Sequence, residues 1–221
     1  MFKRILKLLL GILITPVCIG VSVALYEQLS RIKVISYYHQ KYFAIGIIAY
    51  LVVHALIFKP SYLYIFSHEF MHAIATWISG GRVTAFKVSS KGGSVAVTKS
   101  NLFIALAPYF FPFYTIVATI IFFAAKFFFK SSIDYNPFLF AIGFTLAFHI
   151  ILTVDFLKIR QTDLMHAGYF FSICLIYTVN LMVIGLIFSL LFAGTTFTGF
   201  LTDAYIKSKD IYVGIWNQLF L

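Results

Sequence analysis

The sequence predicts an all-α polytopic membrane protein with about six transmembrane helices and one membrane-associated β-hairpin. Of its 221 residues, 62% are hydrophobic and only 11% are charged, and the mean hydropathy of +0.97 lies outside the range of soluble globular domains. Several apolar runs are long enough to cross a hydrocarbon core about 30 Å thick, which takes roughly 20 helical residues. One stretch rich in Gly and β-branched residues interrupts this pattern and predicts the hairpin.

The helices are expected at six apolar segments, which are residues 5–26, 42–58, 62–79, 101–125, 137–158 and 167–193. The first segment has a basic start but runs on to about Tyr26 without a small-residue cleavage site. We therefore expect a membrane helix there rather than a signal peptide. Two prolines, Pro108 and Pro112, predict a bend in the fourth helix.

Two stretches do not fit a simple helical bundle. Residues 80–100, "GGRVTAFKVSSKGGSVAVTKS", contain two β-rich runs around a Gly turn, and they predict a hairpin with strands at 83–88 and 94–98. The tail from residue 194 to residue 221 mixes Thr and charged residues with Tyr and Trp. An aromatic, weakly charged segment of this kind is typical of the membrane interface.

The formal net charge of +10 would suggest a nucleic-acid partner in a soluble protein. Here the Lys and Arg residues lie at the ends of apolar runs, where lipid headgroups favour them. We therefore expect the lipid bilayer as the partner of these charges, and no nucleic acid. Cys18 and Cys174 lie inside apolar runs, so they resemble buried small hydrophobic residues more than a disulfide or a metal site.

The most specific motif is "HEFMH", which lies inside the apolar segment 62–79. Positions i and i+4 of a helix share one face, so His68 and His72 can present two imidazoles to one metal ion. Glu69 is rotated by about 100° from His68, which lets it reach a water on that ion without being a ligand. In zinc hydrolases the ion lowers the pKa of this water to about 7, and the carboxylate takes its proton. The motif therefore predicts a Zn²⁺ site with Glu69 as the general base.

A zinc ion that keeps one position open for water needs a third protein ligand. Beside Glu69, most acidic residues fall in hydrophilic connections or the tail, which leaves Asp155 and Asp163. Asp155 precedes Lys158 by one turn, so an ion pair at the membrane edge accounts for it. Asp163 opens the sixth helix, where the alternative role is a plain N-cap. The remaining histidines are alternative ligands, although each is expected to hydrogen-bond a neighbour: His54, His149 and His166.

These residues resemble the site-2 protease family of intramembrane zinc metalloproteases, in particular its small bacterial members without accessory domains. The resemblance covers about residues 62–180 and rests on "HEFMH", "SGGRVTAFKVSSKGGSV", "NLFIALAPYFFP" and the acid of "QTDLMHAG". It implies that His68, His72 and Asp163 bind Zn²⁺ and that Glu69 is the catalytic base. It also implies that the hairpin holds the substrate as an added strand.

We therefore expect a zinc-dependent intramembrane endopeptidase of the bacterial cytoplasmic membrane that cleaves a transmembrane or juxtamembrane peptide of another membrane protein. The expected single membrane domain has two helices in 1–58, a metalloprotease-like core in 62–193 and an interfacial tail in 194–221. An alternative is a catalytically silent subunit that scaffolds a membrane complex. A transporter would also explain intramembrane ionisable residues, but it leaves Glu69 between the histidines unexplained.

Overall fold

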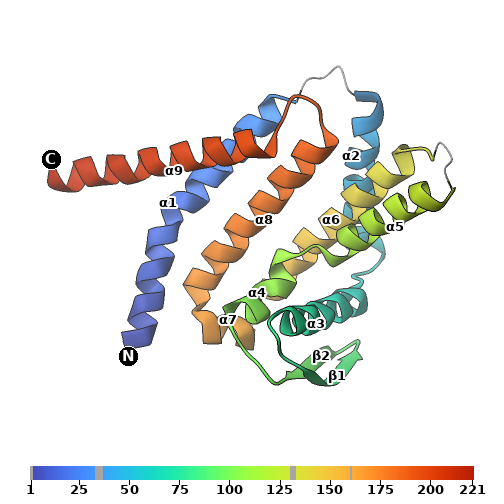
Figure 1. The fold of residues 1–221 in the computed structure, drawn as a ribbon, viewed down its shortest axis with the longest axis horizontal. Coiled ribbons are helices and arrows are strands. Elements are labelled where there is room, and N and C mark those ends of the chain that lie inside the picture. The colour runs from blue at the N-terminus through green and yellow to red at the C-terminus, as the bar shows by residue number, and fades with distance from the viewer. Residues whose placement is uncertain (1, 33–36, 130–132, 160) are drawn as a thin grey trace. The chain divides into compact units, whose positions relative to one another are not determined.

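The computed structural model describes residues 2–32, 37–129, 133–159 and 161–221, which are mostly helical (Figure 1). The chain divides into two compact units, Met1–Ser36 with Thr162–Leu221 and Tyr37–Gln161, and each is described by itself. In chain order the elements are α1 (Phe2–Ser30), α2 (Tyr37–Val52), the π-helical turn η2 (Val53–Ile57), α3 (Ser61–Ile78), β1 (Val83–Ser89), β2 (Gly92–Val97), α4 (Leu102–Phe110), α5 (Phe113–Phe129), α6 (Asn136–Leu157), α7 (Thr162–Ala167), α8 (Tyr169–Leu191) and α9 (Phe197–Phe220).

Four helices among the described residues are long and apolar enough to cross a membrane, and they span Ile5–Ser30, Gln40–Ile57, Asn136–Leu157 and Tyr169–Leu191. The pair α4 and α5 makes a fifth if it forms one broken span. This finding fits a multi-pass membrane protein, with four or five spans where the sequence predicts about six. The difference is α3, because His68, Glu69 and His72 lower its mean hydropathy.

The predicted fourth helix, 101–125, is two helices that meet at an angle of 67°. The break falls at residues 111 and 112, between α4 and α5. Pro112 follows Phe111, whose backbone is extended, as expected for the residue before a proline. The predicted bend is therefore present at Pro112, whereas Pro108 lies inside α4.

The unit Tyr37–Gln161 is built around the close packing of α2 on α6. A Cβ added to Gly46 would lie 2.1 Å from the Phe140 carbonyl oxygen, and one added to Gly143 would lie 2.1 Å from the Phe43 carbonyl oxygen. Small residues let helix backbones approach in this way inside membranes. Beside this contact, α3 joins the core through a buried cluster of Tyr50, Tyr64, Ala147, Phe148 and Leu152.

The predicted hairpin is present and packs against α3 in the same unit. Its strands are antiparallel, with Phe86 opposite Val95 and Val88 opposite Gly93, and an irregularity lies between Val83 and Ala85. Most residues of both strands are exposed. The hairpin therefore rests on α3 while much of its surface stays accessible.

In the other unit, α1 packs against both α8 and α9. A Cβ added to Gly20 of α1 would lie 2.6 Å from the backbone nitrogen of Ser208, so the two helices nearly touch there. Gly168 has a φ of +98°, a conformation that glycine adopts without strain, and it separates the short α7 from α8. The C-terminal tail, expected at the interface, is the 24-residue helix α9.

We predict that Gly143→Ala lowers the stability of the folded protein by about 1–3 kcal/mol, because the new methyl group overlaps a backbone carbonyl of α2. This loss outweighs the gain of about 1 kcal/mol in helix propensity. Thermal unfolding in detergent micelles measures the change. The matched control is Gly214→Ala in α9, where an added Cβ meets nothing within 4 Å, so its stability should stay equal or rise. Equal stability of the two variants would contradict the close α2–α6 contact.

Candidate metal centre

The two histidines of the motif lie on one face of α3, as the spacing predicts. Their ring centroids are 4.9 Å apart and the rings are nearly perpendicular, at 80°. Each side chain is only 8% exposed. Two imidazoles are thus held together in a buried position, an arrangement in which one nitrogen of each ring can bind the same metal ion.

The tautomer of His72 follows from its hydrogen bond to α4. Its Nδ1 lies 2.8 Å from the carbonyl oxygen of Ile104, and a carbonyl oxygen only accepts. Nδ1 therefore carries a proton, and in the neutral imidazole Nε2 carries the lone pair that a metal ion requires. Metal-binding histidines commonly donate their second ring N–H to a backbone carbonyl in this way.

Aromatic side chains fix the ring of His68. The Tyr109 ring meets it edge to face at a centroid distance of 4.9 Å, and the Tyr64 ring lies 5.9 Å away. Tyr109 is fully buried, and Tyr64 is 2% exposed. Because both tyrosines belong to the packed interior of the unit, the orientation of the imidazole is set by the core.

Glu69 is also buried, at 9% exposure, and the hairpin covers its side chain. A Cβ added to Gly93 of β2 would lie 2.5 Å from Cγ and 3.0 Å from Cδ of Glu69. The strand can approach this closely only because residue 93 has no side chain. The carboxylate next to the histidine pair is therefore held between α3 and β2.

Asn101 fixes the start of α4, the helix that carries the Ile104 carbonyl. Its side-chain oxygen accepts a hydrogen bond of 2.7 Å from the backbone nitrogen of Ile104, as an N-cap does. An Asn before an apolar run is a known start signal, so this cap could have been found from the sequence. No sequence signal identifies the contacts of Ile104, Tyr109 and Gly93 with the motif residues, because these contacts depend on the three-dimensional fold.

Asp163 lies in the first turn of α7 and is partly buried. It belongs to the compact unit of α1, α8 and α9, whereas the histidine pair belongs to the other unit. Its role as a third ligand therefore stays a prediction. His166, one of the alternative ligands, lies outside the residues whose side chains the structure describes.

Asp155, the other candidate for the third ligand, is occupied by basic residues. Its carboxylate oxygens lie 2.6 Å from Lys158 Nζ, 3.0 Å from Lys59 Nζ and 3.3 Å from His54 Nε2. The predicted pairing with Lys158 is confirmed. His54 also lies within hydrogen-bond distance of the Tyr50 hydroxyl, at 3.2 Å, so it contacts neighbouring polar groups as expected. His149, the remaining alternative, is a buried residue of α6.

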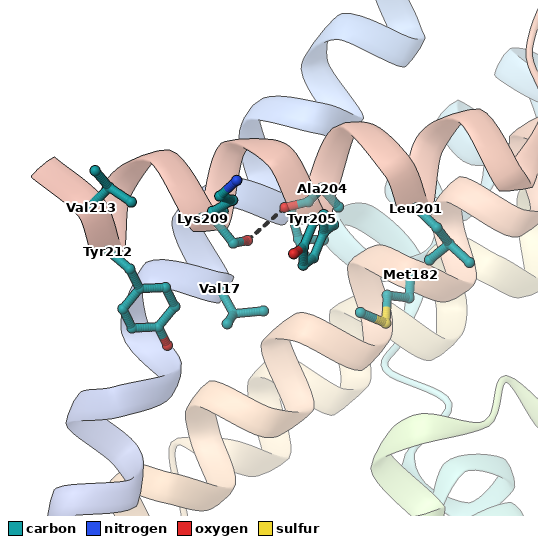
Figure 2. A pocket seen from close by; sticks show the side chains of 10 residues that line it. Val17, Met182, Leu201, Ala204, Tyr205, Lys209, Tyr212 and Val213 are labelled. Carbon is teal, nitrogen blue, oxygen red and sulfur yellow. Dashed lines mark hydrogen bonds between the residues drawn. The ribbon is translucent and has the colours of Figure 1, made fainter.

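A cavity of about 430 Å³ lies in the unit that contains α1, α8 and α9 (Figure 2). Its lining combines aliphatic side chains such as Val17 and Met182 with Tyr205, Lys209 and Tyr212. Its described lining residues include no His, Cys, Asp or Glu, so they do not form a metal site. Cys18 and Cys174 of the same unit are free thiols, in line with the expectation from the sequence.

No protein-family model, no curated protein and no solved structure matches this chain. The resemblance to site-2 proteases therefore rests on the motifs alone and stays a prediction.

We predict that His68→Ala and His72→Ala each lower zinc affinity by more than about 100-fold, which exceeds the cost of losing an outer hydrogen bond. Mass spectrometry of the purified protein, loaded with Zn²⁺ in detergent, measures the bound metal. The matched control is His54→Ala, which removes a histidine from the cluster around Asp155 and should leave zinc bound. Full zinc occupancy in both motif variants would exclude a metal site on α3.

Proposed function

We propose that this protein is a zinc-dependent intramembrane endopeptidase that cleaves a transmembrane or juxtamembrane peptide of another membrane protein. One observation carries the proposal. His68 and His72 are buried side by side on α3, and the carboxylate side chain between them in sequence, Glu69, is buried as well. Ionisable groups in an apolar environment are costly and are rarely kept without a function.

The donor set supports a metal ion, and zinc suits it best. His68, His72 and Asp163 offer two imidazole nitrogens and one carboxylate oxygen, a set that could hold a metal ion. We propose that Asp163 is the third ligand, because the other candidate, Asp155, has two lysines as partners. Three such ligands and one open position are the pattern of catalytic zinc. When bound, zinc would acidify a water molecule and polarise the peptide carbonyl.

Glu69 supplies the proton transfers of the proposed hydrolysis. Its carboxylate would accept a proton from the attacking water as the water oxygen bonds to the peptide carbonyl carbon. It would then give that proton to the departing nitrogen as the C–N bond breaks. The products are a carboxylic acid, which releases its proton to the solvent as it ionises, and an amine, and Glu69 is again a carboxylate.

The hairpin supports a peptide rather than a small molecule as the substrate. A transmembrane helix has its backbone groups paired internally and must unwind before a peptide bond can be attacked. An edge of a two-stranded sheet offers backbone donors and acceptors to such an unwound segment. Because Gly93 of β2 lies against Glu69, a peptide aligned with this hairpin would be near the proposed base.

The apolar helices of the chain support a membrane protein as the proposed substrate. Among the described residues, four helices, or five if the bent pair is one span, are long and apolar enough to cross a bilayer, and a protein in the same bilayer could reach them. The bacterial cytoplasmic membrane is our proposal for the compartment, and it follows from the resemblance to small bacterial members of the site-2 protease family.

We predict that Glu69→Gln lowers peptide cleavage by about 10²–10⁴-fold while zinc stays bound, because a general base is lost and no ligand is. A cleavage assay with membrane-protein substrates in proteoliposomes, together with a zinc measurement, tests this. Glu27→Gln is the matched control, since Glu27 pairs with Lys207 in the other unit. If the wild type binds zinc but cleaves nothing and copurifies with a stoichiometric partner, the scaffold alternative holds instead.

We predict that Asp163→Asn lowers zinc affinity and stops cleavage, because an amide is a poorer zinc ligand than a carboxylate. Asp155→Asn should keep its zinc and lose only about 0.2–1 kcal/mol of stability, as expected for partly exposed ion pairs. Zinc content and thermal unfolding of both variants separate the two residues. Loss of metal from Asp155→Asn with full metal in Asp163→Asn would reverse the assignment.

A further inference from the structure

We infer that Pro108 is a positioning residue that sets the tautomer of His72. Because Pro108 has no N–H, the Ile104 carbonyl lacks the α-helical donor four residues on, and it accepts a hydrogen bond from His72 Nδ1 instead. The consequence for metal binding rests on the proposed function, whereas the effect on the tautomer does not.

The backbone pattern of α4 identifies the missing donor. In an α-helix the N–H of residue i donates to the carbonyl of residue i−4. The nitrogen of Ala105 donates to the Asn101 carbonyl at 3.0 Å, and that of Phe111 donates to the Ala107 carbonyl at 3.2 Å. The corresponding donor for Ile104 would be residue 108, which is a proline and has no N–H.

The Ile104 carbonyl needs a hydrogen-bond donor other than residue 108. Ile104 is only 4% exposed, and Pro108 is buried, so bulk water does not serve the carbonyl. A buried polar group without a hydrogen bond destabilises the folded state. The pyrrolidine ring also crowds the carbonyl of residue i−4, which tilts it away from the helical pattern. His72 Nδ1, at 2.8 Å, provides the required donor.

The same hydrogen bond decides which nitrogen of His72 faces a metal ion. A neutral imidazole has one N–H, and the Ile104 carbonyl accepts only from a protonated Nδ1. The other tautomer would set two lone pairs against each other in a buried place. Pro108 thus acts through a carbonyl one helical turn before it, and it makes Nε2 the unprotonated nitrogen.

A helix-breaking role does not account for Pro108. A proline inside a helix is strongly destabilising, yet α4 continues past it to Phe110. The 67° bend of the chain falls after that point, next to Pro112. Pro108 therefore has no part in ending the helix, and the freed carbonyl is its structural effect.

Pro108→Ala and Pro108→Val test the inference, because each restores an N–H that can donate to Ile104. Valine keeps more of the proline volume than alanine does, so an effect seen in both variants is not caused by a cavity at position 108. The probe is nitrogen-15 NMR of metal-free, histidine-labelled protein in lipid bilayers, at a pH where imidazoles are neutral. The His72 signals are assigned by their loss in His72→Ala.

The wild type should show one tautomer at His72, with Nδ1 protonated and Nε2 unprotonated. Both Pro108 variants should show a mixture of tautomers, and their zinc affinity should fall by about 10–100-fold, the usual effect of losing such an outer hydrogen bond. Pro16→Ala is the matched control, since Pro16 lies inside α1 in the other unit. It should leave the His72 spectrum and the zinc affinity unchanged.

A single Nδ1-protonated tautomer at His72 in both Pro108 variants would overturn the inference, whatever the cleavage activity. If the tautomer shifts in both Pro108 variants but the wild type itself binds no zinc, the inference is supported and the proposed function is refuted. Retained zinc binding and cleavage with an unshifted tautomer would leave the proposed function standing and remove Pro108 from it. The two proposals can therefore fail separately.

Discussion

The hydrogen bond from His72 to the Ile104 carbonyl is the interaction on which the candidate site depends. It joins α3, which carries the motif, to α4, which follows the hairpin in sequence. Asn101 fixes the beginning of α4, because its side-chain oxygen accepts a hydrogen bond from the backbone nitrogen of Ile104. The helices on either side of the hairpin, α3 and α4, are thus joined to each other by this hydrogen bond from His72. Movement of α4 would disturb the imidazole, and a change at His72 would leave a buried carbonyl without its donor.

This dependence arises because α3 carries polar groups in an apolar protein. Three ionisable side chains in one helix exclude it from the candidate membrane spans, so the rest of its unit has to enclose it. Aromatic residues do so: Tyr64 packs on the cluster around Phe148, and Tyr109 covers His68. Every polar atom that is enclosed in this way needs a defined partner. A site that needs a fixed imidazole therefore gains rigidity from the same burial that makes it costly.

Much of the fold could be predicted because long apolar runs specify helices by themselves. The segments 137–158 and 167–193 correspond to α6 and α8 within about two residues, and the hairpin follows from its Gly turn. The division of 101–125 at Pro112 was predicted only as a bend, since the angle depends on what packs beside it. The separation of α7 from α8 depends on the left-handed backbone of Gly168, and the sequence does not show which conformation a glycine adopts.

Part of the candidate site could likewise be predicted from the sequence, and part could not. The pairing of His68 with His72 follows from helical periodicity alone, so it could be predicted without any tertiary information. The acceptor for His72 is a main-chain carbonyl, and main-chain groups carry no sequence signature. Pro108 is visible in the sequence, but its expected effect was a bend. Its effect on a hydrogen bond appears only when the donor of each carbonyl in α4 is identified.

Gly93 shows how the proposed substrate-binding element and the proposed base are coupled. It stands opposite Val88 in the hairpin, and its Cα lies so close to Glu69 that any side chain would overlap the carboxylate stem. In the sequence it is the second of two consecutive glycines at the turn. In the structure the absence of its side chain lets β2 lie directly on α3. The same contact therefore fixes the distance between the hairpin backbone and the carboxylate, which any mechanism that aligns a peptide with this strand requires.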